Sequence, residues 1–367
     1  MANLVSILTQ HAYLSILITF IAGLITMPFV IRIARKHNLV VKPNKRTSHQ
    51  GAIPNIGGLN IFISLLLIYV WLIADAFSIY QLIGFCFIFL VGFIDDMVDL
   101  TPFWKIIGES GAALFLIVFA DVRISHLHGL FGIEELPLWW SYLISYTVFF
   151  AIINSFNLID GVDGLASGLG IVSSLFFAIY FTLVGEALMA LLCFATIGAL
   201  AIFFIYNVFG KSERKIFMGD SGALLTGYLL VCFVFLFLEK NAYHTVDSSY
   251  QMAAAPVVAI CVLFVPLFDT VRIVLTRLKQ GRSPIKPDKN HIHHLLLRTG
   301  LKHRQVTLVL LSVSLVFIVF GIVGRNWNMW LLLTVVFGCG SALTVGLWRI
   351  LDHHAYKNMP PANNSSK

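Results

Sequence analysis

This sequence carries very little charge for its length. Asp, Glu, Lys and Arg make up 12% of its 367 residues, whereas hydrophobic residues make up 58%. A soluble domain cannot bury so large an apolar fraction, so the composition excludes an ordinary soluble enzyme and indicates an integral membrane protein. The first residues, MANLVSILTQ, also lack a basic segment and a small-residue cleavage site, so we expect no removable signal peptide.

Paired cysteines are also missing. The five cysteines stand singly within apolar stretches, and their spacing matches neither a disulfide framework nor a zinc site. We therefore expect them to act as small core residues. They are Cys86, Cys193, Cys232, Cys261 and Cys339.

Long apolar stretches dominate the rest of the chain. They predict an all-α polytopic bundle of about 11 transmembrane helices. No separate soluble domain is evident, so residues 1–351 are expected to form a single membrane domain and residues 352–367 a disordered tail. The expected spans are 12–31, 57–74, 79–94, 105–120, 137–153, 165–184, 187–208, 223–238, 252–271, 306–323 and 327–348.

The basic residues predict the orientation of the bundle. With eleven spans, the loops of one side and the C-terminus carry 22 of the 25 Lys and Arg residues. The opposite side carries only Arg123, Lys240 and Arg325. Because basic loops favour the cytoplasm, we expect a periplasmic N-terminus and a cytoplasmic C-terminus.

An acidic group ends the third apolar stretch, in the motif GFIDDMVDL. Asp99 lies four residues after Asp95 and three after Asp96, so part of the group shares one helical face. Adjacent carboxylates repel one another and persist mainly where a cation or a phosphate reaction uses them. A solvated helix end remains the alternative.

Four polar residues follow one another at steps of three in NSFNLIDGVDGL. They are Asn154, Asn157, Asp160 and Asp163. Because a helix turns about 100° per residue, side chains at this spacing cannot all share one face, so we expect the helix to break near Gly161. A polar loop between two spans is the alternative to a binding site.

The motif MGDSG precedes another apolar stretch. Asp220 and Ser221 suit the N-cap of a helix. A carboxylate at a helix N-terminus also stays ionised and can present a divalent cation to a bound diphosphate. Capping and cation binding are compatible at this position.

The longest polar segment, 272–305, contains GRSPIKPDKNHIHHLL. His291, His293 and His294 lack the spacing of a helical zinc pair, and imidazoles beside Arg282 and Lys289 suit phosphate oxygens. A zinc site and a merely basic loop are the alternatives.

These motifs all fall on the side expected to be cytoplasmic. Ionisable residues are nearly absent from the middle of the spans, where a transporter places its coupling site; the nearest is Glu109 in the fourth span. Aspartates for Mg²⁺, basic groups for phosphates and a membrane frame together favour phosphoryl transfer from a soluble nucleotide to a lipid acceptor. A polyprenyl-lipid transporter and a non-catalytic scaffold are the alternatives from other classes.

The motifs also resemble a known family over nearly the whole chain. KPNKRTSHQG, GFIDDMVDL, NSFNLIDGVDGLASG, FMGDSGALLTGY, VPLFDT and SPIKPDKNHIHH occur in the order typical of the polyprenyl-phosphate N-acetylhexosamine-1-phosphate transferase superfamily. The chain looks most similar to its bacterial undecaprenyl-phosphate N-acetylglucosamine-1-phosphate transferases. This resemblance implies transfer of GlcNAc-1-phosphate from UDP-GlcNAc to undecaprenyl phosphate with release of UMP, in the bacterial inner membrane, with Mg²⁺ or Mn²⁺.

The resemblance also implies roles for individual residues. Asp95 and Asp96 match the catalytic pair, with Asp95 engaging or deprotonating the lipid phosphate. From its place in the same acidic group, Asp99 is expected to be a third catalytic residue. Asp220 matches the metal ligand, with Asn157 as its helper. The expected substrate-binding residues are Lys105, Asn154, Asp160, Asp163, Arg282, His291, His293 and His294.

Several alternatives remain open within this family. The donor is expected to be UDP-GlcNAc, but another UDP-N-acetylhexosamine or the muramoyl-pentapeptide donor of peptidoglycan is the alternative. A direct displacement is favoured over a phospho-aspartate intermediate. The product would start O-antigen or enterobacterial common antigen synthesis. No nucleic acid partner is expected, and a homodimer is left open.

Overall fold

The protein is a bundle of long helices. The computed structural model describes residues 10–41, 53–72, 79–211, 213–242, 247, 249–283 and 290–357. The helices of this part are α2 (Leu14–Lys36), α3 (Gly57–Leu72), α4 (Ile79–Val98), α5 (Pro102–Leu114), α6 (Leu138–Ile159), α7 (Leu165–Leu183), α8 (Ala187–Phe209), α9 (Gly219–Ala242), α10 (Ala255–Val262), α11 (Phe264–Lys279), α12 (Ile292–Arg298), α13 (His303–Val323) and α14 (Met329–Lys357), with the π-helix η1 (Phe115–Phe119) directly after α5.

These helices confirm a multi-pass membrane protein that is mainly α-helical. Among the described residues, nine helical segments are long and apolar enough to cross a membrane, and the bent pair α10 and α11 makes ten if it counts as one span. The apolar helix α3 is shorter. Every expected span overlaps a helix, but the count of eleven and the orientation of the termini stay predictions.

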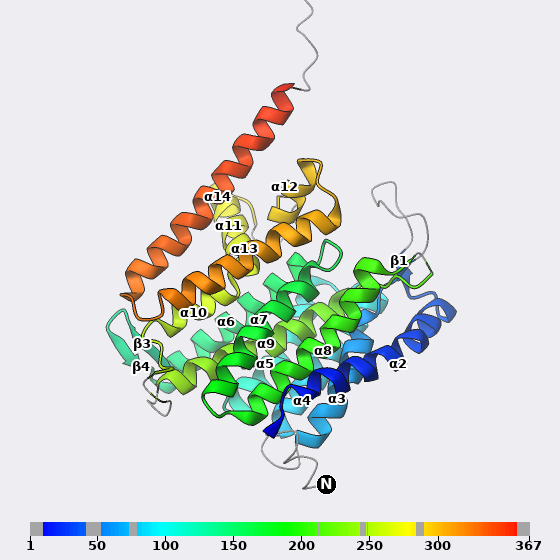
Figure 1. The fold of residues 1–367 in the computed structure, drawn as a ribbon, viewed down its shortest axis with the longest axis horizontal. Coiled ribbons are helices and arrows are strands. Elements are labelled where there is room, and N and C mark those ends of the chain that lie inside the picture. Colours follow the sequence, from blue (N-terminus) through cyan, green and yellow to red (C-terminus); the bar gives the residue numbers. More distant parts are fainter. Residues whose placement is uncertain are drawn as a thin grey trace, which may run out of the picture.

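Helix α9 lies at the centre of the bundle. It packs against α3, α4, α6, α7 and α10, and in Figure 1 it lies near the middle of the bundle. In its most apolar stretch 94% of the residues are buried, the largest share among the candidate spans of the described chain. The core of the protein is therefore built around α9, whose first turn carries Asp220.

The span predicted at 252–271 is broken into two helices. Helices α10 and α11 meet at an angle of 89° next to Leu263. Pro266 lies just after this break, in the first turn of α11, where the missing N–H of proline costs no helical hydrogen bond. The bend directs α11 away from α10, and α12 follows it beside α13 and α14 (Figure 1).

The helices end at two levels, one at each end of the bundle. At one level, the loop after α4 meets the loops before α7 and α9, and Thr307 at the start of α13 donates a hydrogen bond to the carbonyl oxygen of Asp163 at 2.7 Å. At the other level, Ser125 bonds Glu239 at 2.6 Å, and the N–H of Ala254 bonds the carbonyl oxygen of Arg325 at 2.8 Å. The expected acidic and histidine motifs thus share one end of the bundle.

Two short antiparallel strand pairs accompany the helices. Strand β1 (Val40–Val41) pairs with β2 (Ile53–Pro54), and β3 (His126–Leu130) pairs with β4 (Ile133–Glu135). Gly129 within β3 and Gly132 in the β3–β4 turn have φ +79° and +74°, a region that glycine enters without strain. The all-helical prediction missed both pairs because each is much shorter than a span.

Candidate active site

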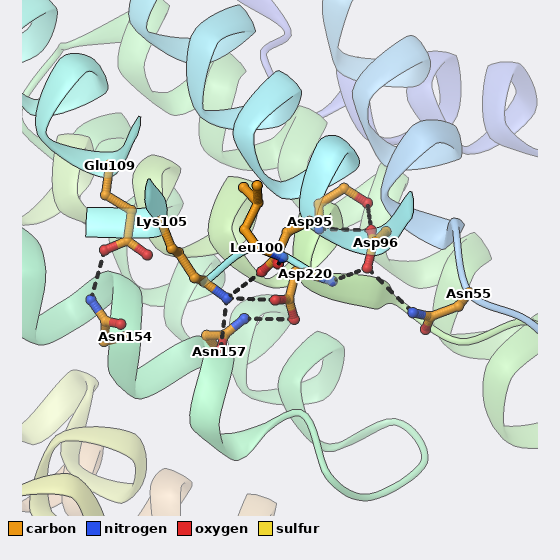
Figure 2. A network of polar contacts seen from close by, with 10 residues as sticks. Asn55, Asp95, Asp96, Leu100, Lys105, Glu109, Asn154, Asn157 and Asp220 are labelled. Carbon is orange, nitrogen blue, oxygen red and sulfur yellow. Dashed lines mark hydrogen bonds and ion pairs between the residues drawn. The ribbon is translucent and has the colours of Figure 1, made fainter. Parts of the chain in front are cut away.

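The ammonium group of Lys105 joins the acidic residues of two helices. Its Nζ lies 2.8 Å from Oδ2 of Asp95 on α4 and 2.5 Å from Oδ2 of Asp220 on α9. Lys105 itself comes from the first turn of α5, after the short loop that follows α4. Figure 2 shows the three side chains pointing toward one another. Residues far apart in the sequence therefore form one charged cluster.

A fourth helix contributes an amide to the same cluster. Asn157, near the end of α6, donates a hydrogen bond from Nδ2 to Oδ1 of Asp220 at 3.0 Å. Its Oδ1 lies 3.5 Å from Nζ of Lys105. The ammonium group thus lies within a cage of oxygen atoms from Asp95, Asp220 and Asn157, which is a site suited to a cation.

The neighbouring Asp96 has a different environment. Its carboxylate accepts hydrogen bonds from the backbone N–H groups of Asp220 at 2.7 Å and Ser221 at 3.0 Å, and from the Ser221 hydroxyl at 2.6 Å. Asn55 adds a longer bond at 3.3 Å. Asp96 thereby satisfies free N–H groups at the start of α9, as an N-cap does. The N-cap role expected of Asp220 or Ser221 falls instead to a residue of α4.

The helices approach too closely here for larger side chains. A Cβ on Gly92 of α4 would lie 2.5 Å from Cα of Ser221, and a Cβ on Gly58 of α3 would lie 2.2 Å from the backbone N of Gly222. Gly219 has φ +71° and would place a Cβ 2.5 Å from Oδ2 of Asp96. Glycine at these positions lets the first turn of α9 lie directly against α3 and α4.

The break between α6 and α7 brings two further aspartates to this end. Helix α6 ends at Ile159 and α7 begins at Leu165, which confirms the predicted break near Gly161. Asp163 pairs with Lys215 at 2.6 Å. Burial, reinforced by the negative charges of Asp220, Asp96 and Asp163, raises the pKa of Asp160 well above its usual range.

A cleft of about 440 Å³ opens beside the α6–α7 turn and the first turn of α9. Its volume falls in the range of ligand pockets, about 300–1,000 Å³. Asp160, Asp163 and Asp220 contribute acidic groups to its wall. His294 and His303 add imidazoles from α12 and α13. The wall is completed by Asn55, Gly161, Val162, Asn207, Phe217, Met218, Gly219 and Leu297.

Asp269, a buried residue of α11, positions the start of α12. One carboxylate oxygen lies 2.8 Å from Nδ1 of His291, and the other accepts the backbone N–H of Ile292 at 3.0 Å. Arg272 bonds both Asp269, at 2.7 Å, and the carbonyl oxygen of Asn290, at 2.5 Å. Asp269 therefore holds the histidine motif in place rather than facing the cleft.

The three histidines have three different surroundings. His291 bonds Asp269, whereas His293 is buried against Gly161, where a Cβ would lie 2.5 Å from its Nε2. Burial, together with the neighbouring His294, lowers the pKa of His293 to about 3, so this imidazole stays neutral at physiological pH. Of the three, His294 is the one that borders the cleft.

Three predicted site residues lie apart from the cluster. Asp99 is exposed just beyond α4, with φ +53°, and Arg282 is exposed after α11. Asn154 bonds the buried carboxyl of Glu109 at 3.0 Å, deeper between α5 and α6 (Figure 2). The structure therefore brings together Asp95, Asp96, Lys105, Asn157 and Asp220 but not these three.

Other residues of the site were not among the predicted ones. Asn55 bonds Asp96 and borders the cleft. Asn207 holds the α6–α7 turn by accepting the N–H of Gly164 at 2.6 Å, and Lys215 pairs with Asp163. The sequence could have indicated such residues only through their position directly beside the recognised motifs, as with Asn55 in IPNIGG.

The donor atoms fit a divalent cation bound with substrate. Within the described residues, no group of three His, Cys, Asp or Glu side chains is arranged to hold a metal by itself. Asp220 and Asn157 nevertheless supply the carboxylate and amide oxygens that Mg²⁺ accepts, and Mg²⁺ commonly takes its remaining ligands from water and substrate phosphates.

Comparison with known proteins agrees with this site. Residues 78–238 match glycosyl transferase family 4. The chain is 33% identical over 294 residues to the undecaprenyl-phosphate alpha-N-acetylglucosaminyl 1-phosphate transferase of Escherichia coli O157:H7, covering 78% of this chain and 77% of that protein. It is 29% identical over 360 residues to the protein of the same name from Yersinia pestis, covering 95% and 94%. It is 32% identical over 333 residues to the probable undecaprenyl-phosphate N-acetylglucosaminyl 1-phosphate transferase of Bacillus subtilis, covering 88% of each. Similarity of this extent, over the helices that carry the acidic cluster, confirms the resemblance seen in the motifs: the chain belongs to glycosyl transferase family 4.

Proposed function

We propose that this protein is a phosphotransferase that moves GlcNAc-1-phosphate from UDP-GlcNAc to undecaprenyl phosphate. The products are undecaprenyl-diphospho-GlcNAc and UMP. The names of the similar proteins support the substrates, and the family supports the reaction type. We further propose that this step starts a surface polysaccharide of the O-antigen or enterobacterial common antigen type.

The observation that carries this proposal is the cluster around Lys105. Its ammonium group bonds carboxylates from α4 and α9 beside a cleft that has room for a nucleotide. Phosphoryl transfer depends mainly on positioning and on charge stabilisation, and a fixed cation among carboxylates at a cleft supplies both. A transporter of polyprenyl lipids has no need of such a cluster.

Each group has a proposed role in the reaction. An oxygen of the lipid phosphate forms a bond to the β-phosphorus of UDP-GlcNAc, and the bond to the UMP oxygen breaks. Asp95 orients the acceptor phosphate or removes its proton, and Lys105 stabilises negative charge on the diphosphate. Asp96 holds the first turn of α9 and so fixes Asp220. Asp160 and Asp163 bind the nucleotide from the α6–α7 turn.

Asp220 and Asn157 are the residues that would hold Mg²⁺ or Mn²⁺. When bound, such a cation neutralises charge on the diphosphate. This arrangement favours a direct displacement, because groups for both phosphates already converge at one place. His294 is placed to contact the donor, whereas His291 and His293 fix α12. Asp99, Asn154 and Arg282 lie outside the cluster and are given no direct role in the transfer step.

The site is proposed to face the cytoplasm, with the N-terminus in the periplasm and the C-terminus inside. Phe103 and Trp104 are 66% and 59% exposed directly beside Lys105. Aromatic residues gather at the interface between lipid and water, so these side chains place the cluster at the depth of a lipid headgroup. A bacterial inner membrane supplies UDP-GlcNAc on that face. Residues 1–351 are proposed to act as one membrane domain.

Reconstitution tests the function directly. The purified full-length protein is incubated with undecaprenyl phosphate and one of several labelled UDP-sugars, with Mg²⁺, Mn²⁺ or EDTA. We expect UMP release and a labelled lipid with UDP-GlcNAc, and a loss of both with EDTA. Asp95→Asn and Asp220→Asn should each abolish product while the protein stays folded in the membrane. Retained turnover in both variants would refute the site, and exclusive use of another UDP-sugar would refute the donor.

A further inference from the structure

An apolar groove runs between α7 and α13 at the end of the bundle opposite the candidate active site. Its volume is about 400 Å³. Leu175, Ile179 and Leu183 of α7 line it, and they are 42%, 50% and 51% exposed; Leu315 of α13, which also lines it, is 49% exposed. The groove therefore opens onto the outer surface of the bundle, where hydrocarbon surrounds a membrane protein.

A guanidinium group marks one end of this groove. Arg325, just after α13, lines it together with Ser249 and Tyr250. In the described part of the chain, the Nε of Arg325 is buried and has no hydrogen-bond partner. Leaving a donor of a charged group unpaired is costly, and an anion at the guanidinium would offset that cost.

The other two basic residues at this end have acidic partners. Arg123 pairs with Asp121 at 2.7 Å, and Lys240 pairs with Glu186 at 2.5 Å. No such pair involves Arg325 among the residues that the structure describes. Among the described Lys and Arg residues of this end, Arg325 is thus the one without an acidic partner, and it lies at the mouth of the groove.

The dimensions of the groove match one leaflet. Leu315 and Arg325 are about ten residues apart, or about 15 Å along a helix, which is half of the roughly 30 Å hydrocarbon thickness. Trp327 and Trp330 follow Arg325 and are 40% and 44% exposed, as expected at the interface between lipid and water. Arg325 thus lies at headgroup depth and the groove extends below it along the acyl chains.

We propose that this groove binds one anionic phospholipid of the leaflet opposite the candidate active site. The lipid phosphate contacts Arg325, and one acyl chain lies along Ile179 and Leu315. Basic pockets between transmembrane helices recognise anionic headgroups by this combination of charge and apolar surface. Because α13 packs against α7 and also bonds the turn before α7 near the active site, through Thr307 and Asp163, the bound lipid would stabilise the packing of both helices.

Native mass spectrometry of the full-length protein tests this inference independently of the proposed function. The protein is exchanged into a mild detergent and mixed with phosphatidylglycerol or phosphatidylcholine of the same chain length. We expect one phosphatidylglycerol to be retained in preference to phosphatidylcholine and to raise the melting temperature. In Arg325→Gln, retention should fall about five- to tenfold, as expected for one lost charged contact. Arg123→Gln, a basic residue of the same leaflet outside the groove, should not reduce it.

A second variant tests the apolar part of the groove. Ile179→Trp should fill it and remove retention of phosphatidylglycerol, whereas Ile25→Trp, on the exposed face of α2, should not. Equal retention of both lipids by the wild type, or unchanged retention in Arg325→Gln, would overturn the proposal. A dimer that dissociates in Ile179→Trp would also overturn it, because a second copy would then occupy the groove.

Discussion

Asp96 on α4 accepts two hydrogen bonds from Ser221 on α9, one from the backbone N–H at 3.0 Å and one from the hydroxyl at 2.6 Å. The second residue of the acidic pair thus fixes the helix that carries Asp220. Ser221→Ala removes one of these bonds and should lower the free energy of unfolding by about 1 kcal/mol. Asp96→Ala leaves several buried donors without an acceptor. It should therefore lower the free energy of unfolding by more than Ser221→Ala does, and turnover should be lost.

Thermal unfolding in detergent measures this difference. Ser110→Ala serves as the control, because its hydroxyl bonds Ile106 and Tyr146 on an exposed face. A larger loss of stability in Ser221→Ala than in Asp96→Ala would contradict the capping role of Asp96.

Removing the charge of Lys105 should affect catalysis more than folding. Lys105→Met leaves Asp95 and Asp220 without their shared ammonium group and removes a donor for the diphosphate. We expect turnover to fall by about 10² or more, as for loss of one donor that stabilises a transition state. Steady-state UMP release measures the effect, with Lys211→Met, an exposed lysine in the α8–α9 loop, as the matched control. Turnover within a factor of two of the wild type would argue against the proposed role.

Substitution of Asp269 should weaken donor binding. Asp269→Asn replaces the ionised partner of His291 and Arg272, so α12 and its His294 lose their fixed position at the cleft. We expect KM for UDP-GlcNAc to rise about tenfold, equivalent to about 1.4 kcal/mol, with a smaller change in kcat. Arg272→Gln should act in the same direction. An unchanged KM combined with a reduced kcat would instead assign Asp269 a part in the chemical step.

The neutral His293 should make the protein less stable in acid. Its pKa of about 3 in the folded state lies below the usual value of about 6.5, so below pH 6.5 the unfolded chain binds a proton that the folded protein excludes. Stability from this group is therefore complete above pH 6.5 and is lost as pH falls toward 3. Melting temperatures at pH 7.5 and 5 should differ less in His293→Gln than in the wild type. An equal difference in both would refute the assignment.

Asp160 should produce the opposite dependence. Its raised pKa means that the folded protein keeps a proton that the unfolded chain loses above its usual pKa of about 3.9. The stability of the wild type relative to Asp160→Asn should therefore fall as pH rises from 4, until the folded carboxyl ionises. Paired melting curves across this range measure it. Asp121→Asn, at the other end of the bundle, controls for general effects of pH, and a relative stability that rises with pH would contradict the prediction.

The sequence predicted where the functional motifs lie but not which role each residue within a motif has. Asp95 and Asp96 are adjacent, and nothing in GFIDDMVDL separates the one that contacts Lys105 from the one that caps α9. That division depends on which carboxylate faces α9, more than 120 positions further along. Asp99 shared the helical spacing of the group, but α4 ends at Val98, so the spacing no longer applies to it.

The helical spans were predictable because apolar stretches of sufficient length have few alternatives in a membrane. The 89° break between α10 and α11 was not, since Pro266 lies within an uninterrupted apolar stretch. The role of Asp269 depends on that break: only after the turn does its carboxylate reach the backbone of α12. Partner residues that meet through a bend leave no periodic signal in the sequence.

The central position of α9 also constrains how the protein is made. This helix emerges from the ribosome after α3, α4, α6 and α7, yet it fills the space between them. Although α3 and α4, and α6 and α7, also contact each other directly, the faces that they turn toward α9 are buried only once α9 has been inserted. Completion of the catalytic cluster is thereby a late event in biogenesis, because Asp220 arrives on the last of its four helices.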